Sequence, residues 1–167
     1  MVIERGGLSP NTARFTASRD PAALADRGKG GLKYLYTAAT VITLFLGQDL
    51  NVRLRPKLLE LRPGTRIVSN TFGMGEWQVD AAAVGEGCSG KWCTAMLWIV
   101  PAKVAGTWTT PHGEVTLRQR FQALSGHLVA GNRAWPLEGR VRGEEIAFTS
   151  RGREYRGRLN GAALELR

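Results

Sequence analysis

The sequence predicts an α+β protein, with an α/β portion in its first half and an antiparallel β meander in its second. A near-continuous apolar run over residues 40–46 is typical of a strand covered on both faces. A leucine-bearing segment over 47–61 follows it, and a second apolar run over 66–72 comes next. From residue 103 onward, short runs alternate between apolar and polar residues and are separated by turn signals, as in a meander.

The segment after the first apolar run has the periodicity of an amphipathic helix. We expect Asp49 to cap this helix and Pro56 to kink or restart it. Because the helix joins two strands, these strands should be adjacent and parallel, with the helix across one face. The apolar stripe of the helix consists of Leu50, Leu54, Leu58 and Leu61.

The rest of the chain divides into three stretches. Residues 1–33 lack clean periodicity and are predicted to be a poorly ordered N-terminal segment. Residues 34–102 form the α/β unit, in which 73–91 are a glycine-rich loop and 93–100 a third strand. Residues 103–167 form the antiparallel β extension.

Charge and hydropathy limit the classes of protein to which this chain could belong. The chain has 167 residues, with 23 Lys and Arg against 14 Asp and Glu, and so a formal net charge of +9. This excess favours acidic partners such as nucleic acid, phosphorylated ligands or anionic lipid, although an arginine-rich soluble protein would look the same. Neither a membrane-spanning run nor an apolar signal region is present, which favours a cytoplasmic protein by default.

The two cysteines, Cys88 and Cys93, lie five positions apart in a glycine-rich stretch. We expect two free loop thiols, with a local disulfide in an oxidising compartment as the alternative. A zinc site needs about four ligands at short spacings, and His112 and His127 lie far away in the sequence. The sequence therefore predicts no metal site.

A series of positions between residues 41 and 77 follows an ordered pattern. It comprises an apolar-Thr-apolar strand end, Asn and LRP in a helix, a PGTR turn, a VS strand and a Phe-x-Met-Gly-x-Trp element. This block resembles a bacterial family of class I S-adenosylmethionine-dependent methyltransferases. The repeated Gly-x-Val/Leu-x-Gly units at 139–143 and 157–161 resemble the β extension of that family. The matching positions are Val41, Thr43, Leu44, Asn51, Leu54, Arg55, Pro56, Leu58, Pro63, Gly64, Thr65, Arg66, Val68, Ser69, Phe72, Met74, Gly75 and Trp77.

The resemblance implies that the α/β unit is the C-terminal remnant of a Rossmann-like methyltransferase sheet. In the family a glycine-rich turn and a ribose-binding carboxylate precede the strand that is placed here at 40–46. Only Gly6-Gly7 and the Gly28–Gly31 stretch precede it here, and neither follows a predicted strand. We therefore identify no cofactor-binding residue and expect a truncated, impaired methyltransferase that does not bind S-adenosylmethionine tightly.

Site residues implied by the resemblance lie at the ends of the strands at 40–46 and 66–72. Asn70 or Gln48 would orient a substrate amine as the candidate catalytic residue. The alternative is that the polar side chains satisfy local hydrogen bonds and the aromatic rings pack in the core. The acceptor implied is a protein lysine or a small-molecule amine. The candidate substrate-binding residues are Thr43, Ser69, Phe72 and Trp77.

Two basic surfaces offer another interpretation. The helix carries Asn51 beside Arg53, Arg55 and Lys57, which would either grip an acidic substrate or form a solvated face. The β extension places arginines on its outward face without interleaved aromatic rings, which makes nucleic-acid binding unlikely. The rival function is a non-catalytic β-rich binding module for an anionic partner, and a third is the product of a damaged gene. The outward arginines are Arg118, Arg120, Arg140, Arg142, Arg156 and Arg158.

Overall fold

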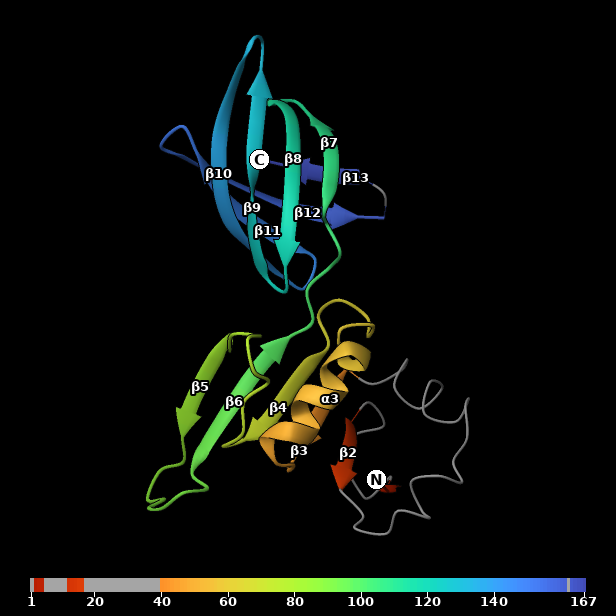
Figure 1. The fold of residues 1–167 in the computed structure, drawn as a ribbon, viewed down its shortest axis with the longest axis vertical. Helices are drawn as coiled ribbons and strands as arrows, with labels where there is room; N and C mark the ends of the chain where they lie inside the picture. Colours follow the sequence, from red (N-terminus) through yellow and green to blue (C-terminus); the bar gives the residue numbers. More distant parts are fainter. Residues whose placement is uncertain (1, 5–11, 17–39, 162) are drawn as a thin grey trace. The chain divides into compact units, whose positions relative to one another are not determined.

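The computed structural model describes residues 2–4, 12–16, 40–161 and 163–167, which fall into two compact units over residues 1–100 and 101–167 (Figure 1). Each unit is built on its own β-sheet. Within these ranges most residues lie in strands, and α3 is the one helix. The chain is therefore richer in β-structure than the α/β pattern of its first half predicted.

The first unit contains a six-stranded sheet in the order β1-β2-β3-β4-β6-β5. Strands β2, β3 and β4 are parallel, whereas β6 lies antiparallel between β4 and β5. The strands are β1 (Val2–Glu4), β2 (Thr12–Thr16), β3 (Val41–Leu44), β4 (Arg66–Asn70), β5 (Ala81–Val84) and β6 (Thr94–Ile99).

The predicted strand, helix and parallel strand are confirmed. Strand β3 pairs in parallel with β4, and α3 (Gln48–Leu58) connects them and lies across them in Figure 1. The predicted cap is wrong, because the helix begins after Gly47 and Asp49 lies within its first turn. There the carboxylate still suits the positive end of the helix dipole. Pro56 does not restart the helix, which runs as one element from Gln48 to Leu58.

The leucine stripe of α3 is only partly buried. Leu58 is buried, but Leu50 is 42 % exposed, and Leu54 is intermediate. The most deeply buried polar residue of the helix is Asn51, at 0 % exposure. The face of α3 that meets the sheet is therefore centred on an amide as well as on leucines.

The predicted glycine-rich loop at 73–91 is wrong in part. It contains β5, which pairs antiparallel with β6, and an isolated bridge between Met74 and Trp77. All four residues of β5 are exposed, so no apolar periodicity marks this edge strand. Its pairing partner, rather than its own composition, makes it a strand.

The second unit is a seven-stranded antiparallel sheet in which each strand pairs with the next along the chain, which confirms the predicted meander. Its buried face encloses an apolar cluster that includes Val115, Leu128, Val141, Phe148 and Tyr155. The strands are β7 (Gly106–Thr110), β8 (Gly113–Arg120), β9 (Ala123–Ala130), β10 (Arg133–Arg142), β11 (Glu145–Ser150), β12 (Arg153–Asn160) and β13 (Ala163–Leu166).

Gln119 is the polar residue that the alternating pattern places on the apolar side of β8. Its Nε2 donates hydrogen bonds to the carbonyls of Ala102 and Phe121, both at 2.8 Å, and its Oε1 accepts one from the Val104 amide. The side chain therefore satisfies main-chain groups where the chain enters the sheet, and its burial is compensated.

Most of the N-terminal segment predicted to be poorly ordered, residues 1–33, lies outside the described residues. Within it the structure places β1 and β2, which the sequence did not predict. Gly6-Gly7 therefore does follow a strand, but the next described element is the antiparallel strand β2. The Gly28–Gly31 stretch lies outside the described residues.

Candidate functional site

The carboxyl ends of the parallel strands β3 and β4 lie at one edge of the first sheet. Leu44, the last residue of β3, pairs with Ser69, the second-last residue of β4, so the segments that follow these strands start close together. Ligands of open α/β sheets bind outside the carboxyl ends of parallel strands. This edge is therefore the candidate functional site, and it is where the sequence placed its candidates.

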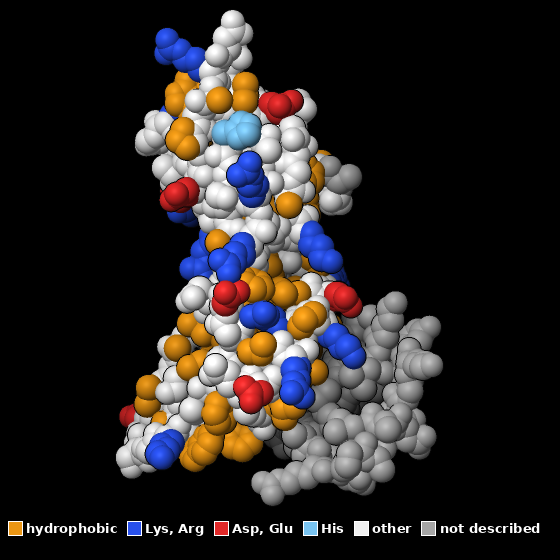
Figure 2. Space-filling model, viewed as in Figure 1, with side chains coloured by type: hydrophobic (Ala, Val, Ile, Leu, Met, Phe, Trp, Pro, Cys, Tyr) orange, Lys and Arg blue, Asp and Glu red, His pale blue; other side chains and the backbone are white. Residues whose placement is uncertain are grey.

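Three aromatic rings gather at this edge, and we call Phe45, Phe72 and Trp92 the aromatic rim. The ring centroid of Trp92 lies 5.3 Å from that of Phe72 and 6.1 Å from that of Phe45, with tilted planes in both pairs. Phe45 is 66 % exposed and Trp92 is 53 % exposed. Hydrophobic side chains of the first unit also gather on the face drawn in Figure 2. Exposed apolar surface of this kind marks binding sites more often than scattered single residues do.

The turn that presents Phe72 has a strained backbone. Thr71 has φ 62°, in the left-handed region that β-branched residues rarely adopt. Its amide donates to the Thr94 carbonyl at 2.7 Å, and its Oγ1 is 3.0 Å from both Asn70 Oδ1 and the Lys91 carbonyl. Strain of this kind persists where surrounding contacts fix the conformation, and it concentrates at functional sites.

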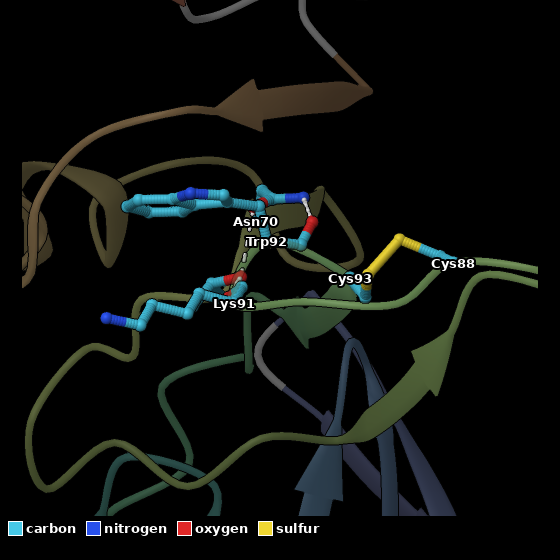
Figure 3. The surroundings of a disulfide bond; sticks show 6 residues. Asn70, Cys88, Lys91, Trp92 and Cys93 are labelled. Atoms are coloured by element: carbon cyan, nitrogen blue, oxygen red, sulfur yellow. Dashed lines mark hydrogen bonds between the residues drawn. A yellow bond between two sulfur atoms is a disulfide. The ribbon is translucent and has the colours of Figure 1, made fainter.

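The loop that carries Trp92 is closed by a disulfide between Cys88 and Cys93, so the prediction of two free thiols is wrong. Asn70 Nδ2 donates a hydrogen bond of 2.8 Å to the Trp92 carbonyl. In Figure 3 the side chains of Lys91 and Trp92 extend to one side, away from the disulfide. The turn at the end of β4 and the disulfide loop thus hold each other, and Asn70 serves that attachment.

Asn51 joins α3 to the same turn. Its buried Nδ2 donates hydrogen bonds of 3.0 Å to Ser69 Oγ and to the Phe72 carbonyl. Arg55, one helical turn later, donates to the Met74 carbonyl at 2.9 Å. Two polar residues of the predicted basic helix therefore face the sheet and fix residues 69–74.

The remaining sequence candidates occupy different environments. Thr43 is half-buried on β3, and Gln48 is exposed at the first position of α3. Trp77 is 1 % exposed and its ring packs against Trp98 in the core. Of the six candidates, Asn70 and Phe72 contact the aromatic rim or its loop directly, and Ser69 is reached through Asn51.

Three residues that matter to this edge escaped the sequence interpretation. Phe45 belonged to the apolar run, Trp92 lay between the predicted loop at 73–91 and the predicted strand at 93–100, and neither position carries a periodic signal. Asn51 stood on a helix among charged residues and was grouped with them. Its place in the matched block, ahead of the equally matched Ser69, was the available signal.

The resemblance places the cofactor's glycine turn and ribose carboxylate before β3, and residues 17–39, which directly precede β3, lie outside the described residues. At the described part of this edge, Gly47 follows β3, and neither β3 nor β4 ends in a carboxylate. No group of His, Cys, Asp or Glu in the described ranges could hold a metal ion. The helix in the described ranges is too short and too polar to cross a membrane.

Comparison with known proteins identifies a related segment. A protein-lysine N-methyltransferase of Saccharolobus islandicus (strain REY15A) is 52 % identical over 40 residues, which are 23 % of this chain and 25 % of that protein. The resemblance to S-adenosylmethionine-dependent methyltransferases is confirmed. The chain thus spans about a quarter of the length of this relative, and no family model matches the chain.

A protein of known structure is also similar in sequence to part of this chain. The RNA methyltransferase of Salinibacter ruber, crystallised with S-adenosyl-L-homocysteine, is 40 % identical to this chain over a match that covers 41 % of this chain and 42 % of that one. The TM-score of 0.36 is too low for this likeness to bear on the fold.

Proposed function

We propose that this chain carries the acceptor side of an S-adenosylmethionine-dependent methyltransferase, and that its first unit derives from the carboxyl-terminal part of a Rossmann-like sheet. The supporting observation is the aromatic rim at the shared carboxyl edge of β3 and β4. Two of its rings are open to solvent, and the third follows a strained turn. The segment shared with a protein-lysine N-methyltransferase favours methyl transfer over other reactions at such an edge.

The acceptor in this proposal is an amine, from a protein lysine or a small molecule. The faces of the rim rings attract organic cations, which suits an alkylammonium group on arrival. The rim would wall the alkyl part of the acceptor. Since Asn70 is bound to the Trp92 carbonyl, its role would be to position the rim rather than to contact the acceptor.

Tight binding of S-adenosylmethionine by this chain is not part of the proposal. A chain without the glycine turn and the ribose carboxylate would lack hydrogen bonds each worth about 1 kcal/mol or more, and this loss would weaken binding by roughly a hundredfold. Calorimetry with the intact chain should accordingly detect no micromolar complex. A micromolar dissociation constant that changes at Ser69 or Asn70 would contradict the expectation of an impaired enzyme.

The acceptor site can be tested without turnover. Titration with a lysine-containing peptide or a polyamine should change the fluorescence of Trp92, and Trp92→Phe should abolish that change. Trp135→Phe, in the second unit, is the matched control and should preserve it. Binding that survives both Trp92→Ala and Phe45→Ala would place the acceptor elsewhere and refute the proposed site.

One observation favours a second function, a binding module for an anionic partner. On the outward face of the second sheet, register pairing lines up Arg120, Ala123, Arg140, Ala147 and Arg156 in a single row. Strands are about 4.8 Å apart, so the arginines of this row recur about every 10 Å with only alanine between them.

Neighbouring carboxylates partly neutralise the positive charge of this face. Arg156 is bridged to Glu154 at 3.0 Å, and in the adjacent row Arg158 is bridged to Glu144 at 2.7 Å. The hydrogen bond and charge of Glu144 raise the pKa of Arg158, which stays protonated in any case.

Heparin can serve as the anionic probe. If this function holds, Arg120→Ala with Arg140→Ala should weaken binding about tenfold and flatten its salt dependence. Equal loss in an Arg151→Ala control would exclude the row as a site.

A further inference from the structure

The disulfide is connected to the aromatic rim through the main chain. Trp92 lies inside the ring that the Cys88–Cys93 bond closes, next to Cys93. Its carbonyl accepts the hydrogen bond from Asn70, and its indole contacts the rings of Phe45 and Phe72. A change in the loop must therefore reach the rim through Trp92.

We propose that Cys88 and Cys93 are a reversible oxidation site, and that their redox state sets the position of Trp92 on the aromatic rim. The redox site stands on its own geometry. Its consequence, that reduction loosens acceptor binding, rests on the proposed function of the rim.

The disulfide is accessible to a reductant. Cys88 is exposed and Cys93 is half-buried, on a loop next to an edge strand whose four residues are all exposed. Exposed disulfides exchange with thiols more readily than buried structural ones. The co-reactant is a dithiol. One of its thiolates attacks Cys88 Sγ and displaces the Cys93 thiolate, which takes up a proton. The second dithiol sulfur then attacks the first and releases Cys88, so the dithiol is oxidised and both cysteines are reduced.

Apart from the disulfide, few interactions fix the shape of the loop. Gly87 and Gly90 have φ 67° and φ 128°, conformations that glycine adopts readily. Glycine also loses more conformational freedom on folding than any other residue, so the loop is costly to order. Beyond the S–S bond, the loop is held by Asn70 and Thr71 at the carbonyls of Trp92 and Lys91 and by main-chain hydrogen bonds of Gly85. Breaking the disulfide removes the one covalent constraint on these glycines, and Trp92 gains freedom to leave Phe72.

The test uses the intact oxidised chain and dithiothreitol under native conditions. Alkylation followed by mass spectrometry should find no free thiol before reduction and both cysteines free afterwards, with unchanged far-UV circular dichroism. Reduction should shift the tryptophan emission, and Trp92→Phe should abolish the shift while Trp135→Phe retains it. The Cys88→Ser/Cys93→Ser variant should show the emission of the reduced protein without reductant.

Two results would overturn the proposal. One is a disulfide that resists dithiothreitol until the chain unfolds. The other is complete reduction with no change in Trp92 emission, which would show that the disulfide does not control the position of Trp92. Amine titrations of both redox forms separate the two proposals. If neither form binds an amine while the emission still shifts on reduction, the acceptor site fails and the redox site stands.

Discussion

The two units treat their large apolar side chains in opposite ways. In the second unit, most of the described large apolar residues lie in the core cluster or pack partly buried against it, and the large apolar side chains that are exposed all belong to the first unit. In the first unit, five large apolar side chains of the described residues are exposed. These are Phe45, Leu50, Val79, Val84 and Trp92. The meander therefore satisfies its own core, whereas the mixed sheet offers surface for a ligand or another chain segment.

Glycines explain how the meander encloses its core. A Cβ at Gly139 would collide with the Ala147 carbonyl and with Phe148, and one at Gly157 with the Glu165 carbonyl. These positions lie on the inner face, where strands approach closely as the sheet bends. The first unit also has an apolar core, in which Ile42, Ile67 and Trp98 are buried, but buried hydrogen bonds of Asn51 join its helix to its sheet. The comparison teaches that the meander depends on close approach of its strands, whereas the attachment of α3 depends on specific hydrogen bonds as well as on apolar packing.

The largest effect should follow from filling the inner face of the meander. Gly139→Ala should lower the free energy of unfolding of the second unit by about 3 kcal/mol, because Ala147 and Phe148 must move aside. Hydrogen exchange of β10 and β11 measures this loss directly. Gly47→Ala is the control, since a Cβ there meets nothing within 4 Å, and it should change stability little. Equal exchange rates in both variants would contradict the packing argument.

An intermediate effect is expected at the buried amide of the first unit. Asn51→Ala leaves Ser69 Oγ and the Phe72 carbonyl without their donor and should cost about 2 kcal/mol. Faster exchange in β3 and β4, with the second unit unchanged, is the expected readout. Arg53→Ala, on the exposed side of α3, serves as control and should stay within about 0.5 kcal/mol. If Asn51→Ala were equally harmless, the helix would be held by its leucines alone.

The smallest effect should be a gain. Asparagine tolerates the left-handed region far better than threonine, so Thr71→Asn should raise the stability of the first unit by roughly 0.5 kcal/mol. Thr71→Val keeps the strain and loses both hydrogen bonds of Oγ1, and it should destabilise the unit. Chemical denaturation of the two variants shows whether each substitution raises or lowers the free energy of unfolding. A destabilising Thr71→Asn would mean that the Oγ1 contacts outweigh the backbone strain.

Sequence reasoning succeeded where hydrophobic periodicity and local turns determine structure. The parallel pairing of β3 with β4 and the meander both follow from apolar patterns and turn residues that lie close together in the chain. It failed where a distant partner decides. Strand β5 consists of exposed residues, mostly alanine, and exists because β6 pairs with it. The Cys88–Cys93 bond likewise depends on a loop shape that glycines leave open in the sequence.

The candidate site could be predicted only in part. Its location at the strand ends, with Ser69, Asn70 and Phe72, came from the resemblance and the strand pattern. The contacts of Phe45 with Trp92 join residues far apart in the sequence, and no periodicity links them. Burial of Asn51 was equally hidden, because an asparagine among arginines has the composition of an exposed helix face.

The position of β6 between β4 and β5 has a consequence for the time course of folding. Strand β4 pairs with β6, which is the second strand after it in the chain, and β3 pairs with β4, from which α3 separates it in the sequence. Each strand of the meander finds its partner immediately after a short turn. Rates of folding fall as contacting residues lie farther apart in sequence. Although ribosomes release residues 40–100 first, we therefore expect residues 106–166 to reach their native hydrogen-bond protection sooner in a refolding experiment.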